Sequence, residues 1–202
     1  MNFDVIHSVE EVNGRRKFSI KGISKDTNRT YGKLYFNRKH GKNIAITGDG
    51  RTEQKLNLDE PHHSTAFTHR PLRNDEVFQV RLDKKNTKYS YSLGIGILLK
   101  SPDDIDLPPQ FWKTSLAWIM HNDKIYQNST AVNQNYGKNL NELQVGDRVG
   151  VMRSRFGALH FFVNGVDQGP ALAHIPETVY GLLELWYNAA KATIVDRESS
   201  LR

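Results

Sequence analysis

The sequence of 202 residues contains no cysteine. This absence excludes disulfides, thiol nucleophiles, iron–sulfur clusters, and zinc fingers or RING domains built on cysteine. It also fits a reducing compartment. We find no motif for a bound cofactor either, and we therefore expect none.

Long hydrophobic runs are also missing. The longest, at positions 93–99, is far shorter than the roughly 20 residues that cross a bilayer. Positions 1–5, Met-Asn-Phe-Asp-Val, have neither the basic start nor the apolar core of a signal peptide. We expect a cytoplasmic protein, with association to a membrane surface as an alternative discussed below.

Helical periodicity is scarce, and alternation of apolar and polar residues is common, which predicts an all-β antiparallel sandwich or barrel with little helix. The segment 110–121 fits a helix or a strand, and 139–143 fits one helical turn. The predicted strands are 18–23, 77–82, 89–98, 148–152, 159–163, 178–186 and 190–195.

Glycine marks two of these strands. Asn164-Gly165 separates an apolar strand from a more polar segment and predicts a tight hairpin, entered at Val163 and left at Val166. Gly94 and Gly96 share one face of their strand, so we expect an aromatic side chain to press against that face. No third glycine and no following helix complete a phosphate-binding loop.

No pattern in the sequence supports catalysis, and we expect no enzyme activity. His62, His63 and His69 are close in sequence, but we expect exposed loop histidines and no metal site. Glu184 alternates with Leu183 and Leu185, which predicts an exposed carboxylate on the outer face of its strand.

Basic residues are concentrated between Gly14 and Lys42, where ten Lys and Arg accompany one acid, Asp26. Such a segment suits an anionic membrane surface or another polyanion, or an exposed face without a partner. Nucleic acid is the less suitable polyanion, because no RNA- or DNA-binding motif is present. The candidate residues for this alternative are Arg15, Arg16, Lys17, Lys21, Arg38 and Lys39.

An ordered set of motifs resembles one family. Positions 36–44, Phe-Asn-Arg-Lys-His-Gly-Lys-Asn-Ile, resemble the opening of a neuralized homology repeat (NHR) domain, although Asn37 replaces the usual His. The resemblance continues through 66–72, 76–81, 92–96, 118–120 and 136–151, and 159–169 is close to the signature of the family. It ends near Asp196.

The resemblance implies an antiparallel β-sandwich related to SPRY domains, with a jelly-roll-like architecture, over residues 35–202. Residues 1–34 would form a basic N-terminal extension packed on the sandwich. It also implies a non-catalytic role in protein binding, in ubiquitin ligases or their adaptors, through recognition of short peptides that contain Asn. Some members are thought to bind phosphoinositides.

Sandwich domains bind mostly through loops at one end, so we place the peptide site in three loops and beside one arginine. The arginine is Arg70, which could orient a loop or hold a carboxylate. We expect Trp186 and Tyr187 to form an apolar wall and Asn188 to contact an amide. The candidate residues are His40, Lys42, Asn43, Arg70, Trp112, Trp186, Tyr187 and Asn188.

Overall fold

The computed structural model describes residues 8–12, 15–19, 32–86 and 90–196. It divides into two compact units, Met1–Gly32 and Lys33–Arg202. The described part of the first unit is an antiparallel hairpin of β1 (Ser8–Val12) and β2 (Arg15–Ser19). That residues 1–34 pack on the sandwich stays a prediction.

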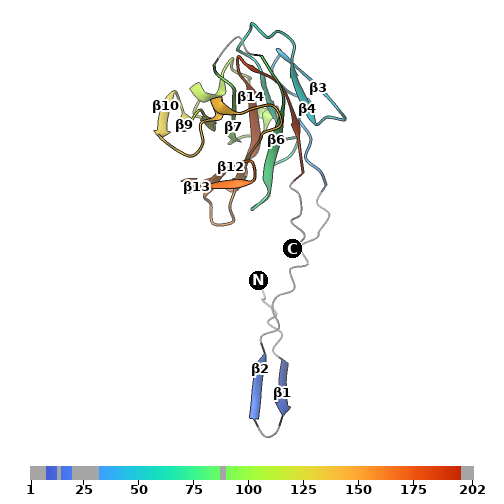
Figure 1. Ribbon diagram of the computed structural model, residues 1–202, viewed down its shortest axis with the longest axis vertical. Helices are drawn as coiled ribbons and strands as arrows, with labels where there is room; N and C mark the ends of the chain where they lie inside the picture. Colours follow the sequence, from blue (N-terminus) through green and yellow to red (C-terminus); the bar gives the residue numbers. More distant parts are fainter. Residues whose placement is uncertain (1–7, 13–14, 20–31, 87–89, 197–202) are drawn as a thin grey trace. The chain divides into compact units, whose positions relative to one another are not determined.

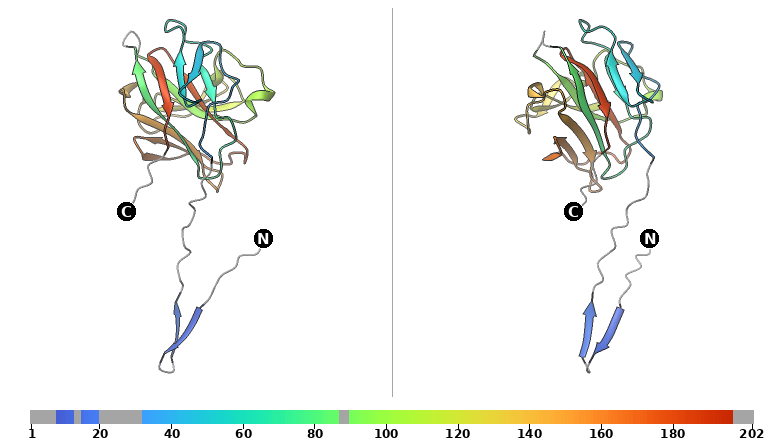
Figure 2. Two further views of the ribbon diagram at one scale, coloured as in Figure 1. Left: turned by 90° about the vertical axis from the view of Figure 1, so that its right-hand side faces the viewer. Right: turned by 45° about the vertical axis from the view of Figure 1, so that its right-hand side comes forward.

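The second unit is built on two antiparallel sheets (Figures 1 and 2). The six-stranded sheet has the order β10 (Thr130–Asn133), β9 (Lys124–Gln127), β8 (Ala117–His121), β7 (Leu93–Leu98), β14 (Tyr180–Leu185) and β5 (Thr65–Phe67). The seven-stranded sheet has the order β13 (Val166–Leu172), β12 (Leu159–Val163), β11 (Arg148–Arg153), β6 (Val77–Lys85), β15 (Ala189–Ile194), β4 (Thr52–Lys55) and β3 (Ile44–Thr47).

The predicted sandwich is confirmed, because the main core draws its apolar side chains from the facing sides of both sheets. Val80 of β6 and Val151 of β11 come from one sheet, and Ile95 of β7 and Leu183 of β14 from the other. All four are at most 1% exposed. Burial of such alternating residues is the main stabilising contribution in a fold of this kind.

Helix is confined, among the described residues, to three short 3-10 turns: η1 (Pro102–Asp104), η2 (Phe111–Lys113) and η3 (Leu140–Glu142). The segment 110–121 is thus split between η2 and β8. The turn predicted at 139–143 is η3, capped by the Asn139 side chain, which accepts a bond from Asn141 N–H at 3.0 Å. None of the described helices is long and apolar enough to cross a bilayer.

The hairpin at Asn164-Gly165 is confirmed, since both residues have positive φ, at 50° and 82°, between β12 and β13. The strand predicted from residue 89 is shorter than expected and starts at Leu93.

A second, smaller core lies on the outer face of the six-stranded sheet. Leu98 of β7, Ile119 of β8 and Leu182 of β14 pack there against Phe111 of η2 and Ile105. The connection between β7 and β8 therefore covers this face of the sheet. Sequence alternation predicts that this face of the six-stranded sheet is exposed, but the connection between β7 and β8 buries it here.

Candidate functional site

Glu184 lies on this covered face, and its predicted exposure is wrong. The side chain is on the side of β14 opposite Leu183 and Leu185, as alternation requires. It is nevertheless only 2% exposed, because the connection that carries η2 closes over it. Period-two alternation identifies the face of a strand, whereas burial depends on what packs on that face.

The Glu184 carboxylate makes four hydrogen bonds, three with residues of η2, β5 and β8 and one with Trp186, just after β14. Its Oε1 accepts from the Phe111 N–H of η2 at 2.8 Å and from Thr65 Oγ1 of β5 at 3.2 Å. Its Oε2 accepts from His121 Nε2 of β8 at 3.2 Å and from Trp186 Nε1 at 3.3 Å. A buried carboxylate is tolerated when its oxygens are satisfied in this way.

Gly94 makes one of these bonds possible. In the β14–β7–β8 register, Gly94 is the partner of Glu184 on one side and of His121 on the other. A Cβ on Gly94 would lie 2.1 Å from Cε1 of His121. The imidazole therefore crosses β7 where that strand has no side chain, which confirms the aromatic contact predicted for this glycine. At Gly96 the close neighbour is instead the Trp118 backbone oxygen, which would lie 2.0 Å from a Cβ at that position.

Above this buried group lies a pocket of about 250 Å³, here called the aromatic pocket. The aromatic rings of its lining contact one another. The ring centroid of Trp112 lies 5.7 Å from that of Tyr126 and 6.2 Å from that of Trp186, and the centroids of Trp186 and His121 are 4.7 Å apart. Tyr91 closes another side, 6.5 Å from Trp186. The lining residues are Tyr91, Ser92, Leu93, Trp112, His121, Asn122, Tyr126, Asn141 and Trp186.

Two buried polar atoms of this lining have no hydrogen-bond partner within the described structure. They are Ser92 Oγ and Trp112 Nε1. Ser92 is 1% exposed, and its backbone N–H donates to Asn141 Oδ1 at 3.1 Å. Such atoms are costly to bury unpaired, and both belong to residues that line the pocket.

Four of the eight predicted peptide-binding residues come together here. Trp112 and Trp186 line the pocket, and Tyr187 lies beside it, with its ring 6.1 Å from Trp186 and 6.2 Å from Tyr91. Asn188 is only 4% exposed, and its backbone N–H donates to the Tyr91 carbonyl at 2.9 Å. It also lines a neighbouring open depression that shares Asn141 with the pocket.

The predicted loop of His40, Lys42 and Asn43 does not line the aromatic pocket. The Asn43 amide is buried and donates to the Asn57 and Glu60 carbonyls at 3.1 and 2.8 Å and to Ser64 Oγ at 3.1 Å. Its Oδ1 accepts from the Asn57 N–H at 2.9 Å. These bonds fasten the loop to the segment before β5. Lys42 is exposed and His40 half-buried.

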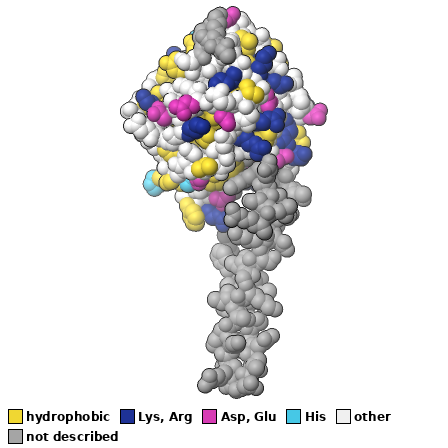
Figure 3. Space-filling view, in the orientation of Figure 1, with side chains coloured by type: hydrophobic (Ala, Val, Ile, Leu, Met, Phe, Trp, Pro, Cys, Tyr) yellow, Lys and Arg dark blue, Asp and Glu magenta, His cyan; other side chains and the backbone are white. Residues whose placement is uncertain are grey.

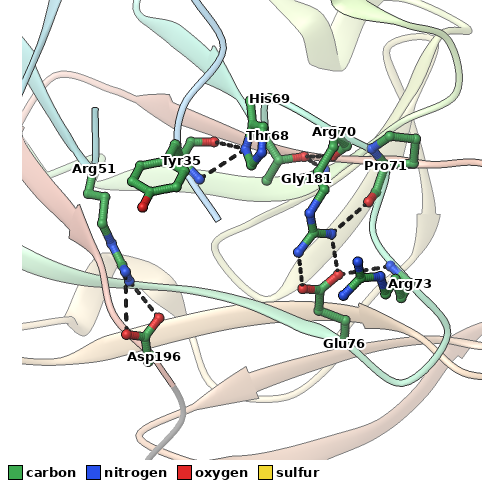
Figure 4. Close-up of polar contacts among 10 residues, drawn as sticks. All are labelled: Tyr35, Arg51, Thr68, His69, Arg70, Pro71, Arg73, Glu76, Gly181 and Asp196. Carbon is green, nitrogen blue, oxygen red and sulfur yellow. Dashed lines mark hydrogen bonds and ion pairs between the residues drawn. The ribbon is translucent and has the colours of Figure 1, made fainter. Parts of the chain in front are cut away.

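Arg70 lies at the other end of the sandwich. It follows β5 beyond Thr68, which pairs with Gly181, so it is separated from Trp186 by the length of β14, roughly 17 Å. Its guanidinium binds both carboxylate oxygens of Glu76 at 2.7 Å and the Pro71 carbonyl at 3.0 Å (Figure 4). This arrangement is that of an ion pair that fixes a loop.

The pKa shifts of Glu76 and Arg70 are consistent with this ion pair. Burial by itself would raise the pKa of Glu76, but the hydrogen bonds from Arg70 and the Arg73 N–H, with both positive charges, lower it overall. The hydrogen bond with Glu76 raises the pKa of Arg70 in turn.

The basic residues of the polyanion alternative are separated by the division into units. Arg15, Arg16 and Lys17 lie on β2, where the register places Arg16 opposite Glu11 and Lys17 opposite Glu10. Lys21 lies outside the described residues. In the sandwich, Arg38 is exposed, whereas Lys39 Nζ donates to the Ile105 and Asp103 carbonyls at 2.6 and 3.3 Å.

Sequence reasoning missed seven of the nine residues that line the pocket: Tyr91, Ser92, Leu93, His121, Asn122, Tyr126 and Asn141. They belong to separate segments that only strand pairing brings together, and the one local signal was the glycine face at Gly94. Within residues 8–12, 15–19, 32–86 and 90–196, no three His, Asp or Glu side chains gather as a metal site.

Comparisons with known proteins agree with this fold. A family model described as Neuralized matches residues 36–196. The crystal structure of the Drosophila melanogaster neuralized-nhr1 domain is 17% identical and covers 83% of this chain and 100% of that chain, with a TM-score of 0.65. The solution structure of the NEUZ (NHR) domain in Neuralized from Drosophila melanogaster is also 17% identical. It covers 82% of this chain and 92% of that chain, with a TM-score of 0.63.

A SPRY domain also aligns with the chain. The crystal structure of the SPRY domain of human HERC1 is 14% identical over 83% of this chain and 99% of that chain, with a TM-score of 0.56. At these sequence identities, the solved structures establish the shared sandwich fold. Membership of the family is established by the family model.

Proposed function

The chain belongs to the Neuralized family, whose fold supports a non-enzymatic protein-interaction module, and we propose that it binds short peptide segments of partner proteins through the aromatic pocket. The anchor in this proposal is an asparagine side chain of the partner. Trp112, Trp186, Tyr187 and Asn188 contribute to the site. His40, Lys42, Asn43 and Arg70 have their places outside the pocket described above.

The observation that supports an amide anchor is the pair of unpartnered polar atoms in the pocket lining. An amide oxygen accepts from Trp112 Nε1–H, and an amide N–H donates to Ser92 Oγ. The aromatic rings around them cover the flat faces of the amide group. An anchor that satisfies both atoms removes a cost that the free protein bears.

Charge disfavours the acidic counterpart of this anchor. An aspartate would bring a second carboxylate close to Glu184, whose oxygens already accept four bonds. A lysine would lose hydration and find no free carboxylate, and Lys113 Nζ already lies 5.2 Å from the Trp112 ring centroid.

The test is a fluorescence-polarisation titration with labelled nonapeptides that carry a central Asn in varied flanks, and with the matching central Ala, Asp and Lys peptides. We expect at least one Asn peptide to bind, with the Ala counterpart about tenfold weaker or more, as for loss of two hydrogen bonds. Failure of every Asn peptide to bind the wild-type protein would refute the proposal.

A matched pair of variants tests the location. Trp112→Phe removes the indole donor and keeps an aromatic wall, so it should weaken the tightest peptide about tenfold. Trp118→Phe changes the same group on β8 outside the pocket lining and should leave affinity unchanged. Equal affinities for the two variants would place the peptide elsewhere.

We also propose that this recognition serves a ubiquitin ligase, as its substrate- or adaptor-recognition part, in the cytoplasm. A chain without cysteine carries no RING, so ubiquitin transfer requires another domain or subunit. Ubiquitylation of a bound partner in cells should fall with Trp112→Phe and stay unchanged with Trp118→Phe. Unchanged ubiquitylation in both variants would argue against this role.

Anionic lipid or another polyanion is the second candidate, because residues 1–32 form a separate unit that carries basic residues. The unit holds six Lys and Arg and four Asp and Glu, a net charge of +2. On the sandwich face in Figure 3, basic and acidic side chains are interspersed. Sedimentation with phosphatidylserine vesicles should show binding that disappears at high salt; sedimentation equal to that with neutral vesicles would contradict it.

A further inference from the structure

We propose that Glu184 is the positioning residue of the aromatic pocket. Its carboxylate holds Trp186 and His121 in place and orders the start of η2, which carries Trp112. The inference rests on the proposed function for the identity of the ligand, but the positioning is a property of this chain and is testable without one.

A row of four residues crosses the six-stranded sheet at Glu184. Thr65, Glu184, Gly94 and His121 are consecutive partners on β5, β14, β7 and β8. Neighbouring strands lie about 4.8 Å apart, so Glu184 and His121 are two strand spacings from each other. They meet at 3.2 Å only because Gly94 between them has no side chain.

The hydrogen bond from Trp186 to Glu184 determines which indole donor remains for a ligand. The Trp186 indole N–H can only donate, and it donates to Glu184 Oε2 at 3.3 Å. The Trp186 donor is thereby withdrawn from any ligand. Trp112 Nε1–H is left as the indole donor that the pocket offers.

A comparison with Glu53 shows that burial does not by itself create this arrangement. Glu53 on β4 is 0% exposed, yet neither of its carboxylate oxygens has a partner in the described structure. Glu184 is equally enclosed but accepts four bonds, two of them from side chains that line the pocket. Glu53 therefore supplies the matched control.

The decisive variant is Glu184→Gln, which keeps the shape of the side chain. Its amide oxygen still accepts from Phe111 N–H and Thr65 Oγ1. Its NH2 group then faces the other two partners, and His121 can switch tautomer and accept, whereas the Trp186 indole only donates. The substitution thus releases Trp186 selectively.

The experiment follows the indole N–H signals of the three tryptophans by NMR hydrogen exchange, together with peptide titration. In Glu184→Gln we expect exchange of the Trp186 indole proton to accelerate at least tenfold. We expect the tightest Asn nonapeptide to bind about tenfold more weakly, while cooperative unfolding is retained. Glu53→Gln should change neither readout.

Should Glu184→Gln fail to fold, Trp186→Phe is the second variant, since it removes the indole bond to Glu184 together with part of the pocket wall. It should weaken the peptide to a similar degree. Unchanged Trp186 exchange in Glu184→Gln, or unchanged affinity in whichever of the two variants folds, would overturn the proposal. If the wild type binds no peptide while Trp186 exchange accelerates in Glu184→Gln, the positioning stands and the proposed function fails.

Discussion

The imidazole of His121 lies against the backbone of Gly94, so closely that a Cβ on this glycine would be 2.1 Å from Cε1 of the ring. Atoms at that distance overlap, and the ring cannot rotate away without losing its 3.2 Å bond to Glu184. Strand, imidazole and carboxylate are therefore one packed unit beneath the pocket.

Substitution of Gly94 by Ala should therefore destabilise the protein by about 1–3 kcal/mol, the usual range for overpacking a core, and weaken peptide binding. Urea unfolding and the nonapeptide titration measure the two effects. Gly32→Ala is the control, because no atom of the described residues, its chain neighbours apart, lies within 4 Å of a Cβ at that position. Equal midpoints for both variants would contradict the contact.

Asn43→Ala should destabilise the fold and not act through the pocket. The variant removes a buried amide that makes four hydrogen bonds and leaves the Asn57 and Glu60 carbonyls without their donor. We expect a loss of about 3 kcal/mol in urea unfolding. Peptide affinity of the folded fraction should be unchanged, and a specific loss of affinity would instead assign Asn43 to the binding site.

Glu76 should make stability depend on pH in the acid range. Its pKa is lowered from 4.5 in the folded protein, so its contribution is present above the unfolded value and is lost as pH falls through the folded one. Urea midpoints should drop between about pH 5 and pH 3. Glu76→Gln should reduce this drop, and an identical pH profile for the variant would rule out the contribution.

Glu53 should make stability depend on pH in the opposite direction to Glu76. Burial first, and then the charge of Glu184, raise its pKa well above 4.5 despite the opposing effect of Lys55. The folded state therefore holds the proton more tightly, and stability is lost as pH rises through the folded pKa. Glu53→Gln should raise the free energy of unfolding, measured with urea, more at pH 8 than at pH 5, by about 1–3 kcal/mol at pH 8. An equal gain at both pH values would contradict this assignment.

Much of the fold was predictable because its signals are local. The alternation in Val77–Lys85 and Leu159–Val163 and the Asn164-Gly165 turn follow from residue types and period two. The short strands β3, β4, β5, β9 and β10 were missed, since three or four residues give too little periodicity to recognise.

The sequence alone determined the fold class, the hairpin, the exclusion of cysteine chemistry and the resemblance to NHR domains that the family model confirms. Tertiary structure alone decided which of the candidate residues share a site. It separated Arg70 from Trp186, assigned Asn43 to a buried network, and enclosed Glu184 beneath a connection. The physical reason is that the identity of a face is set by neighbours in the chain, whereas its burial is set by a segment packed on it from elsewhere.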